Sequence, residues 1–458
     1  MTTENPQTGG RSLKYVGHTA QLRFAHYLAD AFTGKLLHVH GIGWHYWDGK
    51  RWAYDDTGVA WRAVYELLKE LWPFAFGDGD EQKKLAQAIS RCETANGVQG
   101  ILTLARALPR FAATLDDLDA DPHLLNAANG TLDLRTGELR PHSPAYRITK
   151  VCRGAYHPDA ESALWQAFLT RVLPDEGVRG FVQRLAGVGL IGQVREHILP
   201  IWTGTGANGK GSLDRALQHT LGDYAIAAEP DLFMHRDGAH PTGEMDLRGV
   251  RWVTVSESDR DRRLAEATMK RLTGGDRIRA RRMRQDFVEF VPSHTASLIT
   301  NHLPKVRGDD PAIWRRIRVI PFDVVIPPEE QDGELDDRLQ LEADAVLTWA
   351  VNGWRQYQRG GLDAPAVVIA ATDRYHRESH AVSRFVEDRC LTGSTVNKAT
   401  TEQLFKAWEQ WRREEGADEI SMKVFGQSLD KLGYPTSPPC RGKRFRSGIA
   451  VMELEAAE

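Results

Sequence analysis

The chain has 458 residues, enough for about three domains, and a net charge of −3. Hydrophobic residues make up 41% and charged residues 26%, which is the balance of a globular protein and excludes a disordered or fibrous chain. No run approaches the roughly 20 apolar residues of a membrane span, so we expect no membrane partner. The charge also excludes a chain that coats nucleic acid with its whole surface, but it allows a local basic channel.

The N-terminus and the cysteines indicate a cytoplasmic protein. Residues Met1 to Arg11 are polar and lack the apolar core of a signal peptide. The cysteines are far apart without paired spacing, so we expect reduced thiols and no zinc site. They are Cys92, Cys152, Cys390 and Cys440.

The first 145 residues mix helical and strand patterns, which predicts an α+β region. Trp44 to Tyr54 is typical of a hairpin, because Asp48-Gly49 is a two-residue turn between aromatic runs. Its tryptophans could stack on bases or form a buried aromatic cluster. Leu124 to Leu139 has further turn signals at Asn129-Gly130 and Thr136-Gly137. Helical periodicity is found at 21–32, 60–74 and 81–89.

Two helices, expected at Ala160 to Val172 and Gly177 to Leu190, lead into the central part. We place this lead-in at 146–184 and a central domain at 185–365. The short apolar run Ile198 to Trp202 is typical of a buried strand, and strand and helix patterns alternate after it to about residue 325. This alternation predicts an α/β fold with a mostly parallel sheet covered by helices. Further helices are expected at 335–359 and 366–388.

The last part, 385–458, is predicted to be a separate small domain. Thr401 to Glu415 and Ser421 to Leu432 have helical patterns, a basic stretch follows, and residues 448–452 are typical of a strand. This order predicts a winged helix that binds duplex DNA through its second helix and basic wing, with a subunit or partner contact as the alternative. The basic residues are Arg441, Lys443 and Arg444.

A glycine-rich loop directly follows the strand expected at 198–202. Glycines let backbone N–H groups turn inward around a triphosphate, and the next helix points its positive end at the phosphates. Lys210 would reach the β- and γ-phosphates, whereas a plain turn without nucleotide is the alternative. We therefore predict an ATP site that consists of Gly204, Gly206, Asn208, Gly209, Lys210, Gly211 and Ser212.

The residue that would hold Mg²⁺ in this loop is unusual. Gly211 follows Lys210 at the position where a Ser or Thr hydroxyl normally binds the metal. Ser212 comes one place later and is the candidate ligand, either directly or through water.

Two polar residues follow later strands. Glu257 ends the strand-like run Val250 to Ser256, and a carboxylate there can polarise the attacking water or assist Mg²⁺, although capping the strand is the alternative. The residue before it is Ser256, not the Asp that often assists the metal. Asn301 follows the apolar run Ala296 to Thr300 and is the candidate γ-phosphate sensor, although Asn before a loop is usually a turn residue.

Two arginines, Arg315 and Arg316, stand before the last strand pattern of the central part. An arginine presented across a subunit boundary can neutralise charge that develops on the γ-phosphate. Either residue could do this in a ring, and a solvated basic turn or an internal salt bridge is the alternative.

A basic segment lies between Glu257 and Asn301. Gly274-Gly275-Asp276 is a turn signal and arginines alternate after it, so we predict a hairpin around this turn with arginines on one face. Such a surface attracts phosphate backbones and in a ring would line a pore around one strand, whereas a solvated charged hairpin is the alternative. The candidate DNA-binding residues are Lys270, Arg271, Arg277, Arg279, Arg281, Arg282 and Arg284.

The order of these motifs resembles a known family. The runs GTGANGKGS, VTVSES, MKRLTGGDRIRARR, ITNHLPKV and WRRIRVIPF are similar to the core of superfamily 3 helicases. More narrowly, they resemble the phage and plasmid primase-helicase family, which is related to the poxvirus primase-helicase. DPHLLNAANGTLDLRTGELRPHSP resembles the segment that precedes the core in that family. The likeness covers about 110–330 and extends to the expected C-terminal winged helix.

The resemblance implies an AAA+ type ATPase domain, a hexameric ring, magnesium-ATP as cofactor, and translocation on single-stranded DNA, usually 3′ to 5′. Gly211 and Ser256 depart from the pattern of the superfamily. The implied roles fall on Gly204, Gly209 and Lys210 for the phosphates, Glu257 as the acid, Asn301 as the sensor, Arg315 or Arg316 as the finger, and Lys270 before the hairpin.

Many members of this family also carry an N-terminal domain that synthesises primers, which needs paired metal-binding carboxylates. No such pair precedes residue 100, and Asp116, Asp117 and Asp119 are expected in a solvated loop. We therefore expect no primer synthesis and a separate primase or polymerase as a partner.

Three functions remain to be compared. The first is a helicase that unwinds forked DNA, in the host cytoplasm if a phage encodes it. The second is an initiator or loader that binds DNA and uses ATP as an assembly switch without processive unwinding. A metabolic kinase is the third, but it would need an acceptor pocket that nothing in the sequence indicates.

Overall fold

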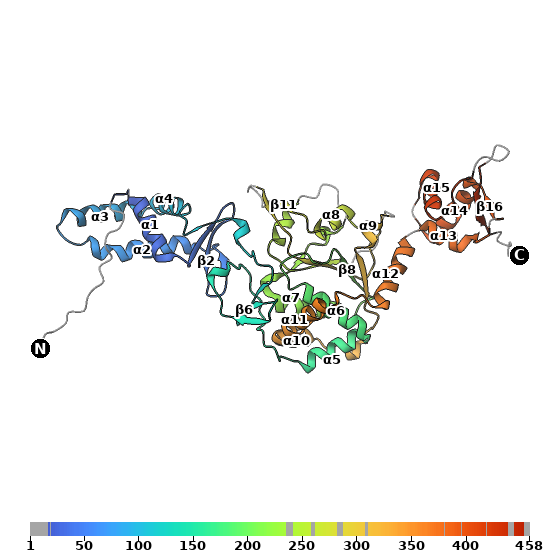
Figure 1. Ribbon diagram of the computed structural model, residues 1–458, viewed down its shortest axis with the longest axis horizontal. Coiled ribbons are helices and arrows are strands. Elements are labelled where there is room, and N and C mark those ends of the chain that lie inside the picture. The colour runs from blue at the N-terminus through green and yellow to red at the C-terminus, as the bar shows by residue number, and fades with distance from the viewer. Residues whose placement is uncertain are drawn as a thin grey trace.

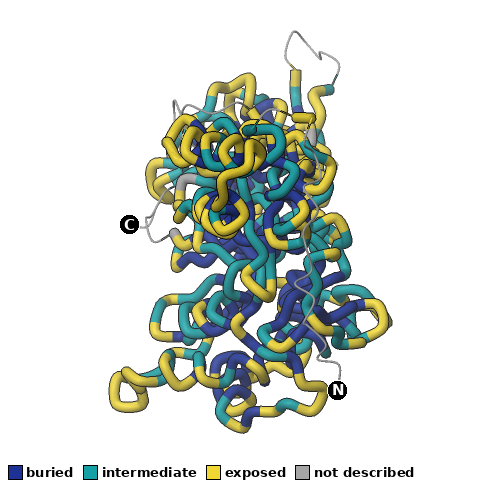
Figure 2. Tube along the Cα trace, turned by 90° about the vertical axis from the view of Figure 1, so that its left-hand side faces the viewer, coloured by how far each residue is buried: buried dark blue, intermediate teal, exposed yellow. Residues whose placement is uncertain are grey.

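Three bodies follow one another along the long axis of the protein, from the N-terminal helices through a central body to a small C-terminal unit (Figure 1). The computed structural model describes residues 17–18, 20–234, 241–257, 262–281, 287–306, 310–379, 381–394, 396–417, 419–437 and 444–452. At Glu257 it describes the backbone alone. Buried residues run through the interior of the bodies and exposed residues surround them (Figure 2).

The N-terminal body packs four helices beside a four-stranded sheet of order β3-β2-β1-β4. The expected aromatic hairpin is confirmed, because β2 pairs with β3 and Trp47 lies opposite Trp52. Trp52 is only 3% exposed, which favours the buried aromatic cluster over base stacking. The elements are α1 (Ala20–Phe32), β1 (Leu36–Val39), β2 (Gly43–Trp47), β3 (Trp52–Tyr54), α2 (Val59–Leu71), α3 (Asp80–Cys92), α4 (Ala95–Ala105) and β4 (Ala112–Ala113).

A three-stranded meander and two helices connect this body to the central sheet. The meander consists of β5 (Leu124–Ala127), β6 (Gly130–Asp133) and β7 (Glu138–Arg140), with turns where the sequence predicts them. The helices are α5 (Ala163–Val172) and α6 (Glu176–Val188).

Helix α6 crosses the boundary expected at 184/185 and packs closely against α11 (Ala343–Gly360). Glycine makes this approach possible, because a Cβ on Gly353 would lie 1.9 Å from the carbonyl oxygen of Gln183. The lead-in helices therefore share one hydrophobic core with the central body.

The central sheet has five parallel strands in the order β14-β8-β13-β10-β9, so the predicted α/β fold with a parallel sheet is confirmed. Alternate residues point to opposite faces of a strand. Trp252 accordingly packs into one hydrophobic core and its neighbour Val253 into the other. Helix α7 (Lys210–Leu221) contacts one face, and α12 (Ala366–Ser379) lies against the edge strand β14. The strands are β8 (Leu199–Thr203), β9 (Ala225–Ala228), β10 (Trp252–Glu257), β13 (Thr295–Thr300) and β14 (Ile317–Pro321).

Both helices expected after the sheet are interrupted. The segment 335–359 forms α10 (Leu335–Leu341) and α11, and the segment 366–388 forms α12 and α13 (Ala381–Arg389). None of the helices in the described part of the chain is long and apolar enough to cross a membrane.

The C-terminal unit contains the two predicted helices, α14 (Thr401–Glu415) and α15 (Met422–Lys431). The predicted strand is β18 (Ile449–Val451), and it pairs antiparallel with β15 (Cys390–Thr392), which precedes both helices. A second pair joins β16 (Lys398–Ala399) to β17 (Arg446–Ser447).

Candidate nucleotide and nucleic-acid sites

The three central motifs lie at one edge of the sheet because three parallel strands end there in register. Thr203, the last residue of β8, pairs with Thr300 of β13, and Thr300 pairs with Glu257 of β10. The glycine-rich loop after β8, Asn301 after β13 and the backbone of Glu257 therefore share the carboxyl edge of the sheet. Ligands of open α/β sheets bind outside this edge.

The loop geometry depends on two glycines that no larger residue could replace. A Cβ on Gly204 would lie 2.4 Å from the carbonyl oxygen of Phe322. A Cβ on Gly209 would lie 2.3 Å from Cγ1 of Val172 on α5, and its φ of 78° is left-handed. The chain thus turns tightly into α7, whose N-terminus begins at Lys210.

Lys210 points back over the loop and is only 5% exposed. Its Nζ donates to the carbonyl oxygen of Gly204 at 2.9 Å, to Oδ1 of Asn208 at 3.0 Å and to Oδ1 of Asn301 at 3.2 Å. Burial lowers the pKa of Lys210 to about 8. Among the described residues its partners are neutral oxygens, so the charge is available to a phosphate group.

The amides of Asn208 and Asn301 hold this arrangement from two sides. Asn208 is 3% exposed and its Nδ2 donates to the carbonyl oxygen of Phe322 at 3.2 Å, which ties the loop to the end of β14. The chain turns after Asn301, where Thr300 Oγ1 donates to the carbonyl oxygen of His302 at 2.7 Å. The structure therefore brings Asn301 to Lys210, as a phosphate sensor would require.

The side of the loop expected to hold Mg²⁺ is covered by Arg215. Its Nη2 donates to Ser212 Oγ at 3.4 Å and its Nε to Asp336 Oδ2 at 2.7 Å. A Cβ on Gly211 would lie 2.9 Å from Arg215 Nη1. The residues thus fit the phosphates of ATP well, whereas Ser212 is the one hydroxyl that α7 offers a metal in its first turn. No three His, Cys, Asp or Glu side chains of the described residues form a metal-binding group.

Asp214 is a residue that sequence reasoning missed. It lies on α7, is 6% exposed, and accepts hydrogen bonds from Thr254 Oγ1 and Gln218 Nε2, both at 2.6 Å. Burial raises its pKa. Asp214 therefore fastens the helix that follows the glycine-rich loop to β10, the strand that ends at Glu257. An Asp in a helical pattern gives no signal of burial, so the sequence could not reveal this role.

Arg315 and Arg316 lie at the opposite edge of the sheet from the loop. They precede β14, which runs parallel to β8 and pairs Pro321 with Thr203 at its far end. Arg315 is exposed, and Arg316 is half-buried with its Nη1 donating to the carbonyl oxygen of Ala312 at 2.8 Å. Within one chain, neither arginine is brought to Lys210.

The predicted basic hairpin exists, but its position differs from the expectation. The segment before Gly274 is helical, as α8 (Glu266–Leu272), so the glycine turn joins a helix to a strand. The hairpin pairs β11 (Ile278–Ala280) with β12 (Val288–Phe290), and its tip with Arg282 and Arg284 lies outside the described residues. The reason is that Met269 and Leu272, which are three residues apart and so share one face of a helix, are both buried in the central core.

The arginines in and directly beside β11 project from one face, as their alternation predicts. Arg277, Arg279 and Arg281 are exposed, whereas Ile278 and Ala280 between them are fully buried.

Phe287, which sequence reasoning missed, lies beside these arginines. It is 46% exposed, and the guanidinium carbons of Arg279 and Arg281 lie 4.8 Å and 4.7 Å from its ring centroid. An exposed aromatic ring between two arginines is the combination that grips single strands without sequence preference.

The two basic residues on α8 are placed differently from those on β11. Arg271 makes two hydrogen bonds to Glu244, at 2.5 and 2.8 Å, and Lys270 forms an ion pair with Asp310. Each positive charge is therefore offset by a carboxylate of the same chain, and neither residue shares the exposed face of β11.

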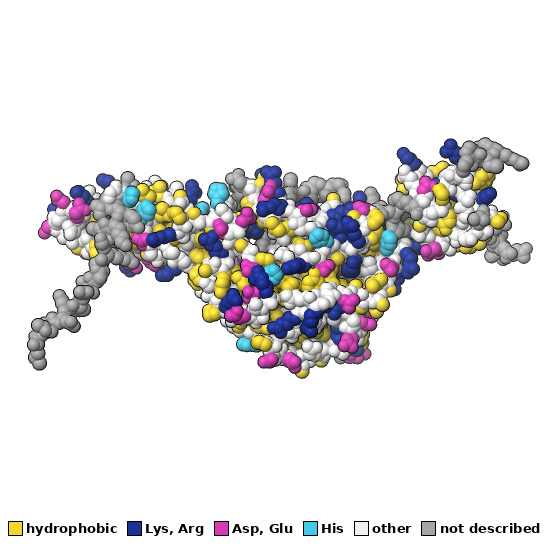
Figure 3. Space-filling model, viewed as in Figure 1, with side chains coloured by type: hydrophobic (Ala, Val, Ile, Leu, Met, Phe, Trp, Pro, Cys, Tyr) yellow, Lys and Arg dark blue, Asp and Glu magenta, His cyan; other side chains and the backbone are white. Residues whose placement is uncertain are grey.

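The C-terminal basic stretch is described only in part. Arg444 is exposed, and Arg441 and Lys443 lie outside the described residues. Nearby Arg446 is buried and donates to Asp430 and to the carbonyl oxygen of Gly426, so it fixes α15 and is not a free surface charge. Basic side chains are also visible on the upper part of the central body in Figure 3.

Residues 25–174 match the family described as D5 N terminal like. This range includes the N-terminal body, the meander and the lead-in up to α5, across the boundary expected at 145. The predicted division between an N-terminal region and a lead-in therefore falls inside one family region.

Curated viral proteins are similar to a longer part of the chain. A putative helicase of Acanthamoeba polyphaga mimivirus is 26% identical over 382 residues, which cover 77% of this chain and 39% of that protein. A putative helicase of Frog virus 3 is 28% identical over 266 residues, which cover 54% of this chain and 27% of that protein. A putative primase of African swine fever virus is 25% identical over 361 residues, which cover 72% of this chain and 38% of that protein. The chain thus spans well under half the length of these relatives.

One solved structure, the apo structure of the NrS-1 C terminal region, aligns with a TM-score of 0.39 at 13% identity. The alignment covers 66% of this chain and 78% of that one.

Proposed function

We propose that this chain, a relative of the primase-helicases of large DNA viruses, is an ATP-driven DNA helicase with an AAA+ type core. The observation that carries the proposal is the meeting of Lys210 and Asn301 above the glycine-rich loop. A lysine and an amide that lie at the ends of adjacent parallel strands suit the γ-phosphate of a nucleoside triphosphate. The strand order, with β8 between β14 and β13, supports the same core type.

Two residues are proposed to hold magnesium. Bound with ATP, Mg²⁺ would neutralise charge on the β- and γ-phosphates. Ser212 and Glu257 are the proposed ligands or water-holding residues, and Glu257 would also polarise the attacking water.

A ring gives the distant arginines a function. Because Arg315 and Arg316 lie at the opposite edge of the sheet from Lys210, they would serve only the ATP site of a neighbouring subunit. We propose a hexamer in which one of them completes that site. Mixing a Lys210→Ala chain with an Arg315→Ala or Arg316→Ala chain tests this. In a mixed ring, some ATP sites combine an intact Lys210 of one chain with an intact arginine of its neighbour. These sites should recover hydrolysis that neither variant shows alone.

The proposed substrate is forked DNA, gripped as a single strand by the hairpin of β11 and β12 during 3′ to 5′ translocation. The exposed arginine face and Phe287 support a sequence-independent grip. The C-terminal unit is the proposed winged helix, with α15 and the basic wing as its duplex contacts. The proposed place of action is the cytoplasm, which is that of the host cell if a phage encodes the chain.

The first experiment measures ATP hydrolysis by the purified chain with and without single-stranded DNA, beside Lys210→Ala. Hydrolysis that DNA stimulates, that Lys210→Ala abolishes, and that accompanies unwinding of a forked duplex supports the helicase. DNA-independent hydrolysis without unwinding favours the alternative, an ATP-switched initiator or loader. No hydrolysis with Mg²⁺ present overturns both.

Primer synthesis is a separate question, because some relatives are named putative primases. Asp116 and Asp117 lie in a short turn after β4, where Asp117 accepts from Thr114. We propose that this chain makes no primers and works with a separate primase or polymerase. Extension of a labelled dinucleotide on a single-stranded template would contradict this.

A further inference from the structure

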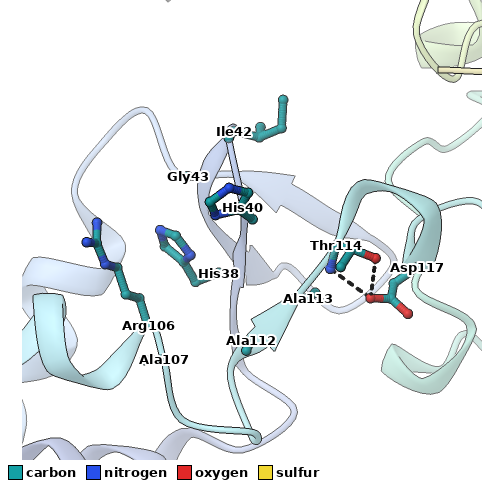
Figure 4. Close-up of a pocket in the computed structure, with 11 residues that line it drawn as sticks. His38, His40, Ile42, Gly43, Arg106, Ala107, Ala112, Ala113, Thr114 and Asp117 are labelled. Carbon is teal, nitrogen blue, oxygen red and sulfur yellow. Dashed lines mark hydrogen bonds between the residues drawn. The ribbon is translucent and has the colours of Figure 1, made fainter. Parts of the chain in front are cut away.

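A cavity of about 630 Å³ lies in the N-terminal body, formed entirely by residues outside the ATPase core (Figure 4). Its walls come from the end of β1 and the turn into β2, from the end of α4, and from β4 with the turn that follows. Small-molecule sites typically have volumes of about 300–1,000 Å³, which includes the size of a nucleotide.

One wall of the cavity is basic. His38, His40 and Arg106 lie along it and point into the same space in Figure 4. Burial lowers the pKa of His38, and the positive charges of Arg106 and His40 lower it further. In the described part of the chain, no carboxylate pairs with Arg106. Arg106 is therefore the permanent positive charge of this wall, while the lowered pKa of His38 favours its neutral imidazole.

The single acidic side chain of the cavity, Asp117, is already occupied. Its Oδ2 accepts from the backbone nitrogen of Thr114 at 2.7 Å and from Thr114 Oγ1 at 2.9 Å, and its Oδ1 lies 3.2 Å from Arg147 Nη1. These hydrogen bonds lower the pKa of Asp117. Asp117 therefore stays ionised but is held at the far side, where it does not neutralise the basic wall.

Two features keep the basic wall in place and open. The ring of His38 packs edge-on against Trp44, with centroids 5.0 Å apart. Gly41 has a φ of 77° and no neighbour within 4 Å of a would-be Cβ, so Gly41 itself leaves space open, and Ile42 is the apolar side chain that the same turn contributes to the lining. A concave surface with a basic wall suits a ligand that carries an anionic group.

We propose that this cavity binds the phosphate group of a nucleotide, with Arg106 as the principal contact and His38 and His40 as further donors. Arg106 can bind a phosphate with two parallel hydrogen bonds, and imidazoles can donate one each. The phosphate could belong to a free mononucleotide or to a single strand that passes over the N-terminal body. The proposal goes beyond the ATPase and the hairpin, because it concerns a different body and needs no ATP.

The experiment uses the full chain without ATP and two probes, thymidine monophosphate and a 15-residue oligothymidylate that contains 4-thiothymidine. Arg106→Gln is the test variant. Arg110→Gln is the matched control, because Arg110 is also exposed, lies four residues away and is paired with Asp30 outside the cavity. Photocrosslinking of the oligonucleotide, followed by mass spectrometry, locates contacts on residues 36–47 independently of DNA bound elsewhere.

We expect Arg106→Gln to lower the affinity for one of the two probes about tenfold, as loss of a charge-assisted contact does. Arg110→Gln should leave the affinity for both probes unchanged. If the strand is the source, the crosslink to residues 36–47 disappears in Arg106→Gln and the salt dependence of binding falls by about one unit. If the mononucleotide is the source, only its affinity falls.

The proposal is overturned if Arg106→Gln and a His38→Gln, His40→Gln double variant match Arg110→Gln with both probes at unchanged thermal stability. This outcome is distinguishable from failure of the proposed helicase, because ATP hydrolysis plays no part in the measurement.

Discussion

The ammonium of Lys210 lies 3.2 Å from the side-chain oxygen of Asn301, although 91 residues separate the two in the sequence. The register of β8 and β13 produces this contact, since Thr203 and Thr300 end neighbouring strands side by side. Asn301 therefore occupies one hydrogen bond of the residue that would grip the phosphates. Changing Asn301 tests whether the contact is part of the site.

Asn301→Asp should raise the KM for ATP about tenfold or more. A carboxylate at this position would form an ion pair with the buried Lys210 and compete with the phosphates for its charge. Asn301→Ala should instead lower kcat about a hundredfold, as loss of one preorganised polar group at a reacting centre does, with a smaller effect on KM. Steady-state ATPase kinetics separate the two variants. An unchanged KM in Asn301→Asp would show that the side chain leaves Lys210 when ATP binds.

The affinity for ATP should fall as the pH rises from 7 to 9. Burial lowers the pKa of Lys210 from its usual 10.5 to about 8, so the charged form that attracts phosphate is lost in this window. The same shift has an opposite effect on the nucleotide-free fold. Between about pH 8 and 10.5 the folded chain binds fewer protons at Lys210 than the unfolded chain, so this group makes the free energy of unfolding rise with pH.

Titration with a fluorescent ATP analogue at several pH values measures the first effect. Lys210→Arg is the control, because a guanidinium remains charged throughout the range. A pH dependence that is identical in Lys210→Arg would assign the effect to another group.

The magnesium requirement should respond in opposite directions to two neighbouring changes. Ser212→Ala removes the hydroxyl that Arg215 now contacts, and it should raise the Mg²⁺ concentration for half-maximal hydrolysis several-fold. Gly211→Ser restores a hydroxyl at the usual position and should lower that concentration. The new side chain fits if the guanidinium of Arg215 moves away, because a Cβ on residue 211 would contact only the flexible end of the Arg215 side chain. If neither variant changes the Mg²⁺ titration, the metal is held by other residues.

Helix α7 should depend on Asp214 for its attachment to β10. Asp214→Ala leaves the hydroxyl of Thr254 without its buried acceptor and should lower the free energy of unfolding by about 2–3 kcal/mol. Asp214→Asn keeps an acceptor for Thr254 and should cost less than about 1 kcal/mol, since the amide of Gln218 can rotate to match. Denaturant unfolding compares the two variants. Equal losses would mean that the charge of Asp214, not its hydrogen bonds, matters.

Local sequence patterns were sufficient for several strands, β8, β10 and β13 among them, and for the turn into α7. The apolar run before Gly204 and the glycines around Lys210 predict a strand, a turn and a helix N-terminus without any long-range information. The exposed arginines of β11 also follow from alternation alone, because Ile278 and Ala280 between them are apolar. Each of these features depends on residues within a few positions of one another.

Features that depend on distant partners could not be predicted. Glu244 neutralises Arg271, and only the folded chain brings the two together. The basic run from Met269 to Arg271 looks the same in a helix or a strand, so the hairpin was expected one segment too early. The cavity near His38 and Arg106 joins a strand to the end of a helix far along the chain, and neither residue stands in a motif.

The hairpin provides the most direct test of the proposed grip on DNA. Arg279 lies opposite Glu289 in the register of β11 and β12, with Nε 3.9 Å from the carboxylate, and its guanidinium covers the ring of Phe287. Arg279→Gln should weaken single-stranded DNA binding about tenfold and reduce the stimulation of ATP hydrolysis. Glu289→Gln removes the opposing negative charge from the same face and should tighten binding modestly.

Phe287→Ala separates stacking from charge on this face. Loss of a base-stacking ring costs about 1–3 kcal/mol of binding, and the loss should persist at high salt, where the effect of Arg279→Gln fades. Fluorescence anisotropy of a labelled oligothymidylate at two salt concentrations measures all three variants. If Glu289→Gln and Arg279→Gln change binding in the same direction, the hairpin acts through its fold and not through the charge of its exposed face.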